Sequence, residues 1–325
     1  MITEEQFNDN VKNVQLSSRD CKNRPREFKK RKVGAKFEGN SGSLRVLSRI
    51  LPFLLGEVLD ESQVGDLILK LQEIAELITA PKLTIHEIET VMHFAILEYL
   101  DMRHDAIENF GMRQHRPKHH FLSHYSELYK YHGPLIHLWA MRMEAKHQYF
   151  KNCIRTSKNF INPTKTCAVR HQKAQITYSY NGLFPRKYVI PSDAVSVSDM
   201  SQVSNDPFLQ MFISRISKGS VIPKNITVFG TKYEAGMILV LEKSNYGEIK
   251  AGLLRAISFC KERVFFACSV FQAFQSKHGY YMSKKKIKEF EIVEHDGLGD
   301  YQPLHKIGSS EDFCFSLHHF VSEYC

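Results

Sequence analysis

The chain has 325 residues, of which 43% are hydrophobic, enough for two domains with cores of their own. No apolar run approaches the roughly 20 residues that a membrane span requires, and no N-terminal segment has the pattern of a secretory signal. The seven cysteines show no C-x-x-C pair and no regular spacing. We therefore expect a soluble intracellular protein with reduced thiols.

The net charge of +9 is concentrated in two segments. Residues 12–36 hold ten lysines and arginines against two acids, and residues 113–173 hold twelve against two, so the rest of the chain is net acidic. A locally basic surface attracts polyanions, and each phosphate that it neutralises releases counterions. The charge pattern predicts a nucleic-acid partner, the alternative being a solvated surface laced with ion pairs.

Residues 1–42 are polar and almost free of aliphatic periodicity, which predicts a flexible basic arm. A run of four cations within it is typical of DNA-binding arms and of nuclear addresses, and it favours the nucleus over the cytoplasm. This run consists of Lys29, Lys30, Arg31 and Lys32.

Residues 43–176 have the pattern of a helical domain. Apolar residues recur at three and four positions along residues 44–55, where Pro52 divides or kinks the helix, and again along residues 65–78. A third helix begins at Thr84, whose spacing to Glu87 is that of a capping box. Three amphipathic helices in succession imply a bundle.

The last third of the chain has a different period. Residues 177–223 place Gly, Pro, Ser and Asp between short apolar runs, which predicts a linker. Residues 224–325 alternate with period two over five or six short strands, which predicts a small antiparallel β-barrel. The expected fold class is α+β, a helical domain followed by this barrel.

Four histidines fall within residues 115–124. A helix that begins after Pro117 places His120 and His124 on one face at i, i+4, a spacing that chelates metals. A zinc protease needs Glu directly after the first histidine, where Phe121 stands, so that class is excluded. The pair stays a candidate metal site, with a structural polar pair as the alternative.

A second cluster lies on a helix expected over residues 135–158, in the string M-E-A-K-H-Q-Y-F-K. Glu144 and His147 are i, i+3 neighbours, but a di-iron bundle needs this motif on two helices and no second copy occurs. The alternative for Glu144 is a solvated carboxylate among lysines. Four cations of this helix are expected to contact phosphates, namely Lys146, Lys151, Arg155 and Lys158.

These same residues carry a resemblance to a known family. K-H-H-F-L-S-H-Y, G-P-L-I-H-L-W-A-M-R-M-E-A-K-H-Q-Y-F-K and R-H-Q resemble the terminal part of the transposases of CACTA-like (EnSpm-related) DNA transposons of animals and fungi. The upstream string G-N-S-G-S-L-R-V-L-S-R-I-L-P-F-L-L-G is similar to the helix that precedes this part. The resemblance covers residues 39–175, and the β segment resembles the small barrel of the animal versions through less specific motifs.

The resemblance implies chemistry that composition and spacing do not give. In such DDE-type transposases, two aspartates and a late carboxylate of an RNase-H-like core hold metal ions for phosphoryl transfer. Residues 43–176 then correspond to the end of that core with helical additions, and Glu144 to the late carboxylate and metal ligand. His120, His124 and His147 match the family's histidines.

The two aspartates should lie upstream, where this chain has a basic arm and a helix. A hard divalent cation needs several oxygen ligands, so Mg²⁺ is expected only where the missing aspartates are supplied, and no other cofactor is expected. The resemblance thus implies a transposase fragment or domesticated remnant that associates with DNA without cutting it alone. The alternative is a protein- or chromatin-interaction module carried by the barrel.

Overall fold

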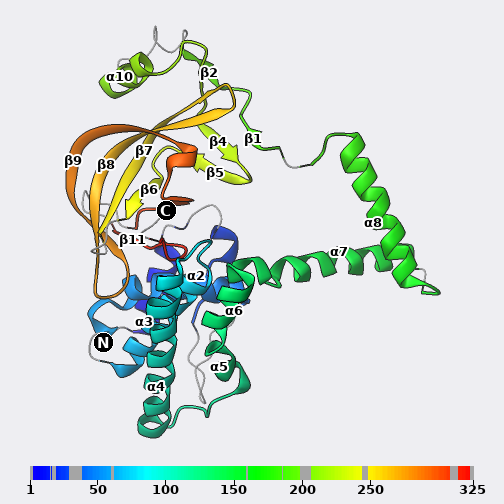
Figure 1. Ribbon diagram of the computed structural model, residues 1–325, viewed down its shortest axis with the longest axis vertical. Helices are drawn as coiled ribbons and strands as arrows, with labels where there is room; N and C mark the ends of the chain where they lie inside the picture. Colours follow the sequence, from blue (N-terminus) through cyan, green and yellow to red (C-terminus); the bar gives the residue numbers. More distant parts are fainter. Residues whose placement is uncertain are drawn as a thin grey trace.

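The computed structural model describes residues 3–14, 16, 20–28, 39–59, 62–158, 160–184, 186–197, 206–243, 248–307 and 314–322. A helical bundle lies below a curved antiparallel sheet, and two helices project from them (Figure 1). The predicted α+β class, with helices first and antiparallel strands last, is confirmed. The basic run Lys29, Lys30, Arg31 and Lys32 lies outside the described residues.

The helical part has the following order. The α-helices are α1 (Glu4–Asn13), α2 (Ser41–Leu55), α3 (Gln63–Ile78), α4 (His93–Phe110), α5 (Pro117–Leu122), α6 (Tyr125–His132), α7 (Met141–Ser157) and α8 (Pro163–Tyr180). Shorter 3₁₀ or π turns join them, namely η1 (Cys21–Asn23), η2 (Gly56–Leu59), η3 (Glu87–Met92) and η4 (Leu135–Leu138).

The segment predicted to be a flexible basic arm begins with a helix that packs on the bundle. Phe7 and Val11 lie one turn apart on α1 and are buried against Leu47 and Ile50 of α2. Arg24 then donates to the carbonyl oxygens of Val11 and Lys12 at the end of α1. Two apolar residues at i, i+4 are enough to dock a short helix on a bundle, so the expected flexible arm is corrected for residues 3–14.

The capping box expected before the third helix is present. The Glu87 backbone N–H donates to Thr84 Oγ1 at 3.2 Å, and the Thr84 N–H donates to Glu87 Oε2 at 2.7 Å. The bundle core lies behind this cap and includes Leu77, Met92 and Ile96. The sequence predicts this capping box correctly because Thr84 and Glu87 lie within one helical turn of each other.

Two helices differ from their predicted extents. The His-rich helix divides into α5 and α6 at Ser123 and His124. The long helix expected over residues 135–158 divides into η4 and α7 because Trp139 is extended, with ψ of 119°. The predicted kink at Pro52 falls within α2, which continues to Leu55.

The strands form antiparallel ladders. They are β1 (Tyr188–Val189), β2 (Val195–Ser196), β3 (Val221–Ile222), β4 (Asn225–Val228), β5 (Thr231–Glu234), β6 (Ile238–Lys243), β7 (Glu248–Cys260), β8 (Arg263–Gln275), β9 (Tyr281–Glu294), β10 (Asp300–Leu304) and β11 (Cys314–Phe315). The main sheet has the order β10-β6-β7-β8-β9-β11, and a smaller sheet has the order β1-β4-β5. Lys261 and Glu262, both with positive φ, make the tight turn between β7 and β8.

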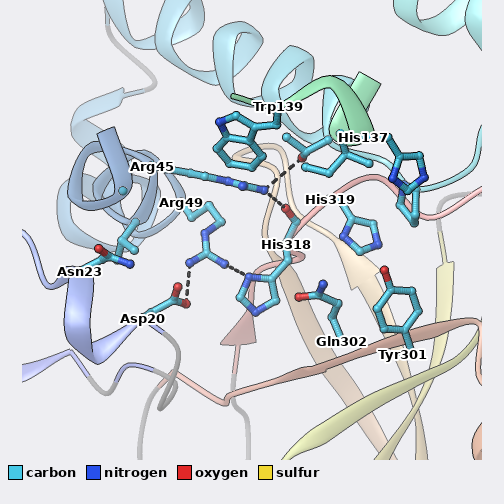
Figure 2. Close-up of a pocket in the computed structure, with 15 residues that line it drawn as sticks. Asp20, Asn23, Arg45, Arg49, His137, Trp139, Tyr301, Gln302, His318 and His319 are labelled. Atoms are coloured by element: carbon cyan, nitrogen blue, oxygen red, sulfur yellow. Dashed lines mark hydrogen bonds and ion pairs between the residues drawn. The ribbon is translucent and has the colours of Figure 1, made fainter. Parts of the chain in front are cut away.

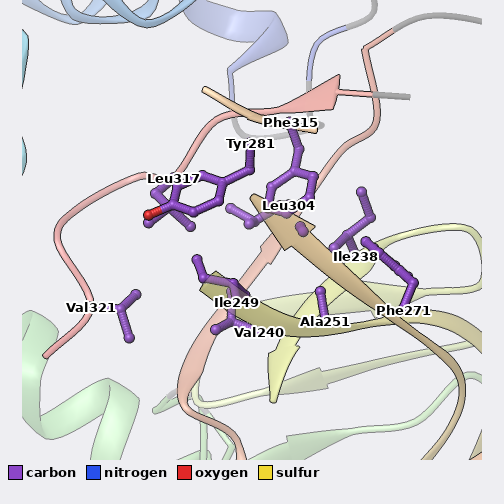
Figure 3. Close-up of a cluster of buried hydrophobic side chains, with 11 residues drawn as sticks. Ile238, Val240, Ile249, Ala251, Phe271, Tyr281, Leu304, Phe315, Leu317 and Val321 are labelled. Carbon is purple, nitrogen blue, oxygen red and sulfur yellow. The ribbon is translucent and has the colours of Figure 1, made fainter. Parts of the chain in front are cut away.

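The expected closed barrel is corrected to an open, strongly curved sheet. No ladder among the described residues joins the end strands β10 and β11. A single bridge pairs Ile307, shortly after β10, with Cys314 of β11. Side chains from the strands and from the C-terminal segment, including Phe315, Leu317 and Val321, pack together in one buried cluster (Figure 3).

The segment expected as a linker takes part in the sheet. β1 pairs with β4, and β2 pairs with β3, which in turn pairs with β7. Helix α10 (Pro207–Arg215) buries Phe212 against Ala256 and Ala267, two small residues of β7 and β8. Residues 188–197 and 206–222 therefore lie with the strands that follow them.

The C-terminal segment returns to the bundle after β11. The Phe320 N–H donates to the Glu76 carbonyl oxygen of α3 at 3.0 Å, and the Phe320 ring packs against the bundle core. On the sheet side, Lys243 donates to the Val321 carbonyl oxygen. This segment joins the two halves. None of the helices in the described ranges is long and apolar enough to cross a bilayer.

Candidate nucleic-acid interface

Helices α7 and α8 form a projection that we call the helical arm, residues 141–158 and 160–180. Figure 1 shows the arm extending away from the bundle and the sheet. Cys153 is the one buried side chain among those described in the arm, and α8 has none. A helix pair with so little buried surface presents nearly all of its side chains to a partner or to water.

The two helices are held together by a few specific contacts. Arg170 of α8 donates to the Cys153 carbonyl oxygen at 3.2 Å and to Thr156 Oγ1 at 2.7 Å. Asn162 caps α8 by accepting from the Lys165 N–H at 3.0 Å. The His171 ring contacts Tyr149, with centroids 6.0 Å apart. These contacts fix the pair without neutralising its cations.

The arm is strongly basic. Residues 141–180 contain eight lysines and arginines and one acid, Glu144, a net charge of +7. Seven of these eight cations have described side chains, and none of the seven takes part in an ion pair within the described part of the chain, whereas Lys70 in the bundle contacts both Glu73 and Glu98 at 2.8 Å. Exposed cations without nearby carboxylates give a positive surface potential.

Three of the predicted phosphate contacts share one face of the arm. Lys151, Arg155 and Lys158 follow one another at four and three residues and are exposed, so they line about 10 Å of one side of α7. Lys146 is also exposed and lies over the Tyr149 ring at 5.0 Å. Helix α8 adds Lys165 and Lys173, both exposed, which the sequence prediction did not single out although they lie in the same basic segment.

Large apolar side chains are exposed at the ends of α8. Phe160 and Ile161 precede the helix and are 73% and 96% exposed, and Tyr180 at its end is 90% exposed. Exposed rings beside cations are typical of surfaces on which nucleic-acid bases stack. The arm thus combines the two side-chain types that bind a polynucleotide without sequence preference.

The predicted metal-ligating residues are partly brought together. His120 Nε2 and His124 Nε2 lie 3.2 Å apart at the junction of α5 and α6. Glu144 and His147 are exposed on the first turns of α7. The helix dipole stabilises a carboxylate at this end of a helix. Within the described ranges no group of three or more His, Cys, Asp or Glu could hold a metal ion.

No family model, curated protein or solved structure matches this chain. The candidate interface therefore rests on the charge, exposure and geometry of the arm.

Proposed function

We propose that this chain is a DNA-associated, nuclear protein derived from the C-terminal portion of a CACTA-like transposase, and that the helical arm contacts the phosphate backbone. The observation that carries this proposal is the +7 charge of an exposed helix pair, in which the seven cations with described side chains make no ion pair within the described structure. Lysines and arginines without partners gain the most from neutralising phosphates. The resemblance of residues 39–175 to such transposases agrees with this role, and the correspondence of the helical part to the end of an RNase-H-like core belongs to the same proposal.

In this proposal, the protein does not cleave DNA by itself. Glu144, the residue that resembles the late catalytic carboxylate, is exposed and belongs to no described cluster of metal-ligating residues. Divalent metal ions in two-metal sites need several oxygen ligands. We expect no Mg²⁺-dependent nicking of a supercoiled plasmid. Nicking by the wild type that Glu144→Gln abolishes would replace this proposal with an active nuclease.

Fluorescence anisotropy of a labelled random duplex, titrated with the full chain from about 50 to about 200 mM salt, tests the binding role. We expect the logarithm of the association constant to fall linearly with the logarithm of salt. The double charge reversal Lys151→Glu/Arg155→Glu should weaken binding and reduce the slope by about two, because roughly 0.9 counterion is released per phosphate contact.

A matched control changes the same charge elsewhere. Lys218 and Lys224 are exposed in the sheet part of the chain, and Lys218→Glu/Lys224→Glu lowers the net charge by the same amount. Equal loss of binding in both double variants would mean that total charge, and not the arm, drives association. Absence of any duplex binding by the wild type would remove the proposal.

The alternative role, a protein- or chromatin-interaction module in the sheet, has less support. Part of the sheet is covered by the chain's own Phe315, Leu317 and Val321 (Figure 3). A partner would have to use another surface of the sheet or displace this segment.

A further inference from the structure

A cavity of about 530 Å³ lies where several distant segments of the chain meet, among them the following four. η1 contributes Asn23, α2 contributes Arg45 and Arg49, the stretch before α7 contributes Trp139, and the C-terminal segment contributes His318 (Figure 2). Small-molecule sites have volumes of about 300 to 1,000 Å³ and are concave, with a few polar groups among apolar and aromatic ones. The cavity is of the size that encloses a nucleotide.

The lining is cationic. Arg45, Arg49 and three histidines, His137, His318 and His319, face one carboxylate, Asp20, in the described lining. Asp20 Oδ2 lies 2.6 Å from Arg49 Nη2, so this acid chiefly compensates Arg49. Behind the wall, Glu76 interacts electrostatically with both arginines, and Asp300 lies 3.4 Å from His319. In the lining itself, cationic side chains outnumber carboxylates, which favours an anionic ligand.

Arg49 is an unusual residue to find inside a helix bundle. Its side chain is 8% exposed, and beside Asp20 it contacts His318 Nδ1. Its Nε is buried without a hydrogen-bond partner in the described structure. A buried guanidinium costs free energy unless it is paired, and Asp20 supplies that partner in this wall.

Arg45 is fixed in a pose suited to a phosphate. Its Cζ lies 4.9 Å from the centroid of the Trp139 ring, and its Nη2 donates to Thr79 Oγ1 at 3.1 Å and to the His318 carbonyl oxygen at 3.0 Å. A guanidinium held by stacking and hydrogen bonds loses little side-chain entropy on binding an oxyanion. Trp139 and Tyr301, 40% and 45% exposed, add aromatic rings to the same cavity.

We propose that this cavity binds a nucleoside phosphate, with the phosphate beside Arg45 and the base against the aromatic rings. Arginine is the preferred partner of phosphate oxygens, and aromatic rings stack on any base. Two sources share this chemistry, a free mononucleotide and the 5′-phosphorylated end of a DNA strand. Trp139 lies two residues before α7 begins, so the cavity is at the root of the helical arm. The proposal concerns a different site from the backbone contacts of the arm and does not depend on them.

The chain provides its own probe, because Trp139 is its single tryptophan. Tryptophan-selective fluorescence of the full chain is titrated with adenosine monophosphate, adenosine, a 5′-phosphorylated oligonucleotide and the same oligonucleotide with a 5′-hydroxyl. We expect saturable quenching by the monophosphate and about tenfold weaker binding of adenosine, because the charge-assisted phosphate contacts are missing. If the 5′-phosphorylated oligonucleotide binds more tightly than the 5′-hydroxyl one, the cavity accepts the end of a DNA strand. If the two bind equally, the ligand is the free mononucleotide.

Arg45→Met removes the charge and keeps much of the volume, and should weaken monophosphate binding by about tenfold. Lys218→Met, at an exposed position outside the cavity and the helical arm, is the matched control and should leave it unchanged. Arg45 also bonds Thr79 and the C-terminal segment, so its replacement could disturb the fold. His137 is exposed in the same lining, and His137→Gln should weaken monophosphate binding by a few fold without that effect. Competition by inorganic phosphate against the monophosphate in the wild type needs no variant.

Three results would overturn the site: no saturable quenching of the wild type by any phosphorylated ligand, equal binding of adenosine and its monophosphate, or unchanged binding by folded Arg45→Met. Duplex binding by the arm, measured by anisotropy at 5′-hydroxyl ends, is a separate readout. If the wild type binds the monophosphate but not the duplex, the proposed function is wrong and this site stands. If it binds the duplex but not the monophosphate, this site is wrong and the proposed function stands.

Discussion

Ser322 Oγ donates a 2.8 Å hydrogen bond to Glu87 Oε2, across 235 residues of sequence. The same carboxylate oxygen accepts from the Thr84 N–H and so closes the capping box of the third long helical segment. Glu87 and Ser322 are 5% and 2% exposed. The end of the chain is thus built into a helix start in the bundle, which makes the bundle and the sheet depend on one another for stability.

Ser322→Ala should lower the free energy of unfolding by about 1.5 to 3 kcal/mol, the range for a buried hydrogen bond to a charged group. Urea denaturation followed by far-UV circular dichroism measures the change. Ser214→Ala is the control, since exposed Ser214 bonds only its own helix at the Met211 carbonyl oxygen in the described structure and should change stability by less than about 0.5 kcal/mol. Equal effects of the two variants would contradict a structural role for the C-terminal segment.

Stability should depend on pH through Glu76. Burial raises the pKa of the Glu76 carboxyl from 4.5 to about 7, although Gln72, Arg49 and Arg45 favour its charged form. Between these two values the folded chain binds more protons than the unfolded chain, so the free energy of unfolding falls as pH rises from about 4.5 to about 7. The contribution is at most about 3 kcal/mol.

Glu76→Gln removes this group and should flatten the decline, as measured by urea denaturation at several pH values. Glu73→Gln on the same helix is the control, because its side chain is 43% exposed and pairs with Lys70. The idea fails if Glu76→Gln and the wild type lose stability in parallel over this range.

Gly252 of β7 is required by close packing against β8. A β-carbon at Gly252 would lie 2.6 Å from Cys268 Cβ, and both residues are buried in the sheet. Gly252→Ala should therefore lower the free energy of unfolding by about 1 to 3 kcal/mol, the usual cost of overpacking. At Gly219 a β-carbon meets no atom within 4 Å, so Gly219→Ala should be neutral or slightly stabilising. Denaturation curves in which the two variants coincide would refute this account.

The His120 and His124 pair should bind Zn²⁺ weakly as a two-nitrogen chelate. Two nitrogens about 2.0 to 2.1 Å from a tetrahedral zinc ion lie roughly 3.3 Å apart, close to the observed 3.2 Å between the two Nε2 atoms. Calorimetric titration with Zn²⁺ should lose this binding in His120→Ala/His124→Ala, because each variant side chain lacks the ligating nitrogen. His104→Ala/His132→Ala, at two exposed positions, is the control. Wild-type affinity in the first double variant would leave the pair a structural contact.

Sequence reasoning was most accurate where both partners of a signal lie close along the chain. The capping box of Thr84 and Glu87, the apolar spacing of α3 and the basic composition of the arm all follow from residues within a few turns. It was less accurate for β9, which spans Tyr281–Glu294. Only residues 290–293 showed an apolar run, and the lysine-rich stretch before them gave no strand pattern. The pairing of β9 with β8 supplies the missing information.

The sequence by itself determined the order of helices and strands, the antiparallel class of the sheet and the concentration of charge on α7 and α8, because periodicity, caps and composition act locally. Only the tertiary structure decided that the sheet stays open, that β1 and β3 pair with later strands, and that Arg45, Trp139 and His318 meet in one cavity. Those outcomes depend on which distant apolar faces and edges come together, and no local pattern encodes that choice.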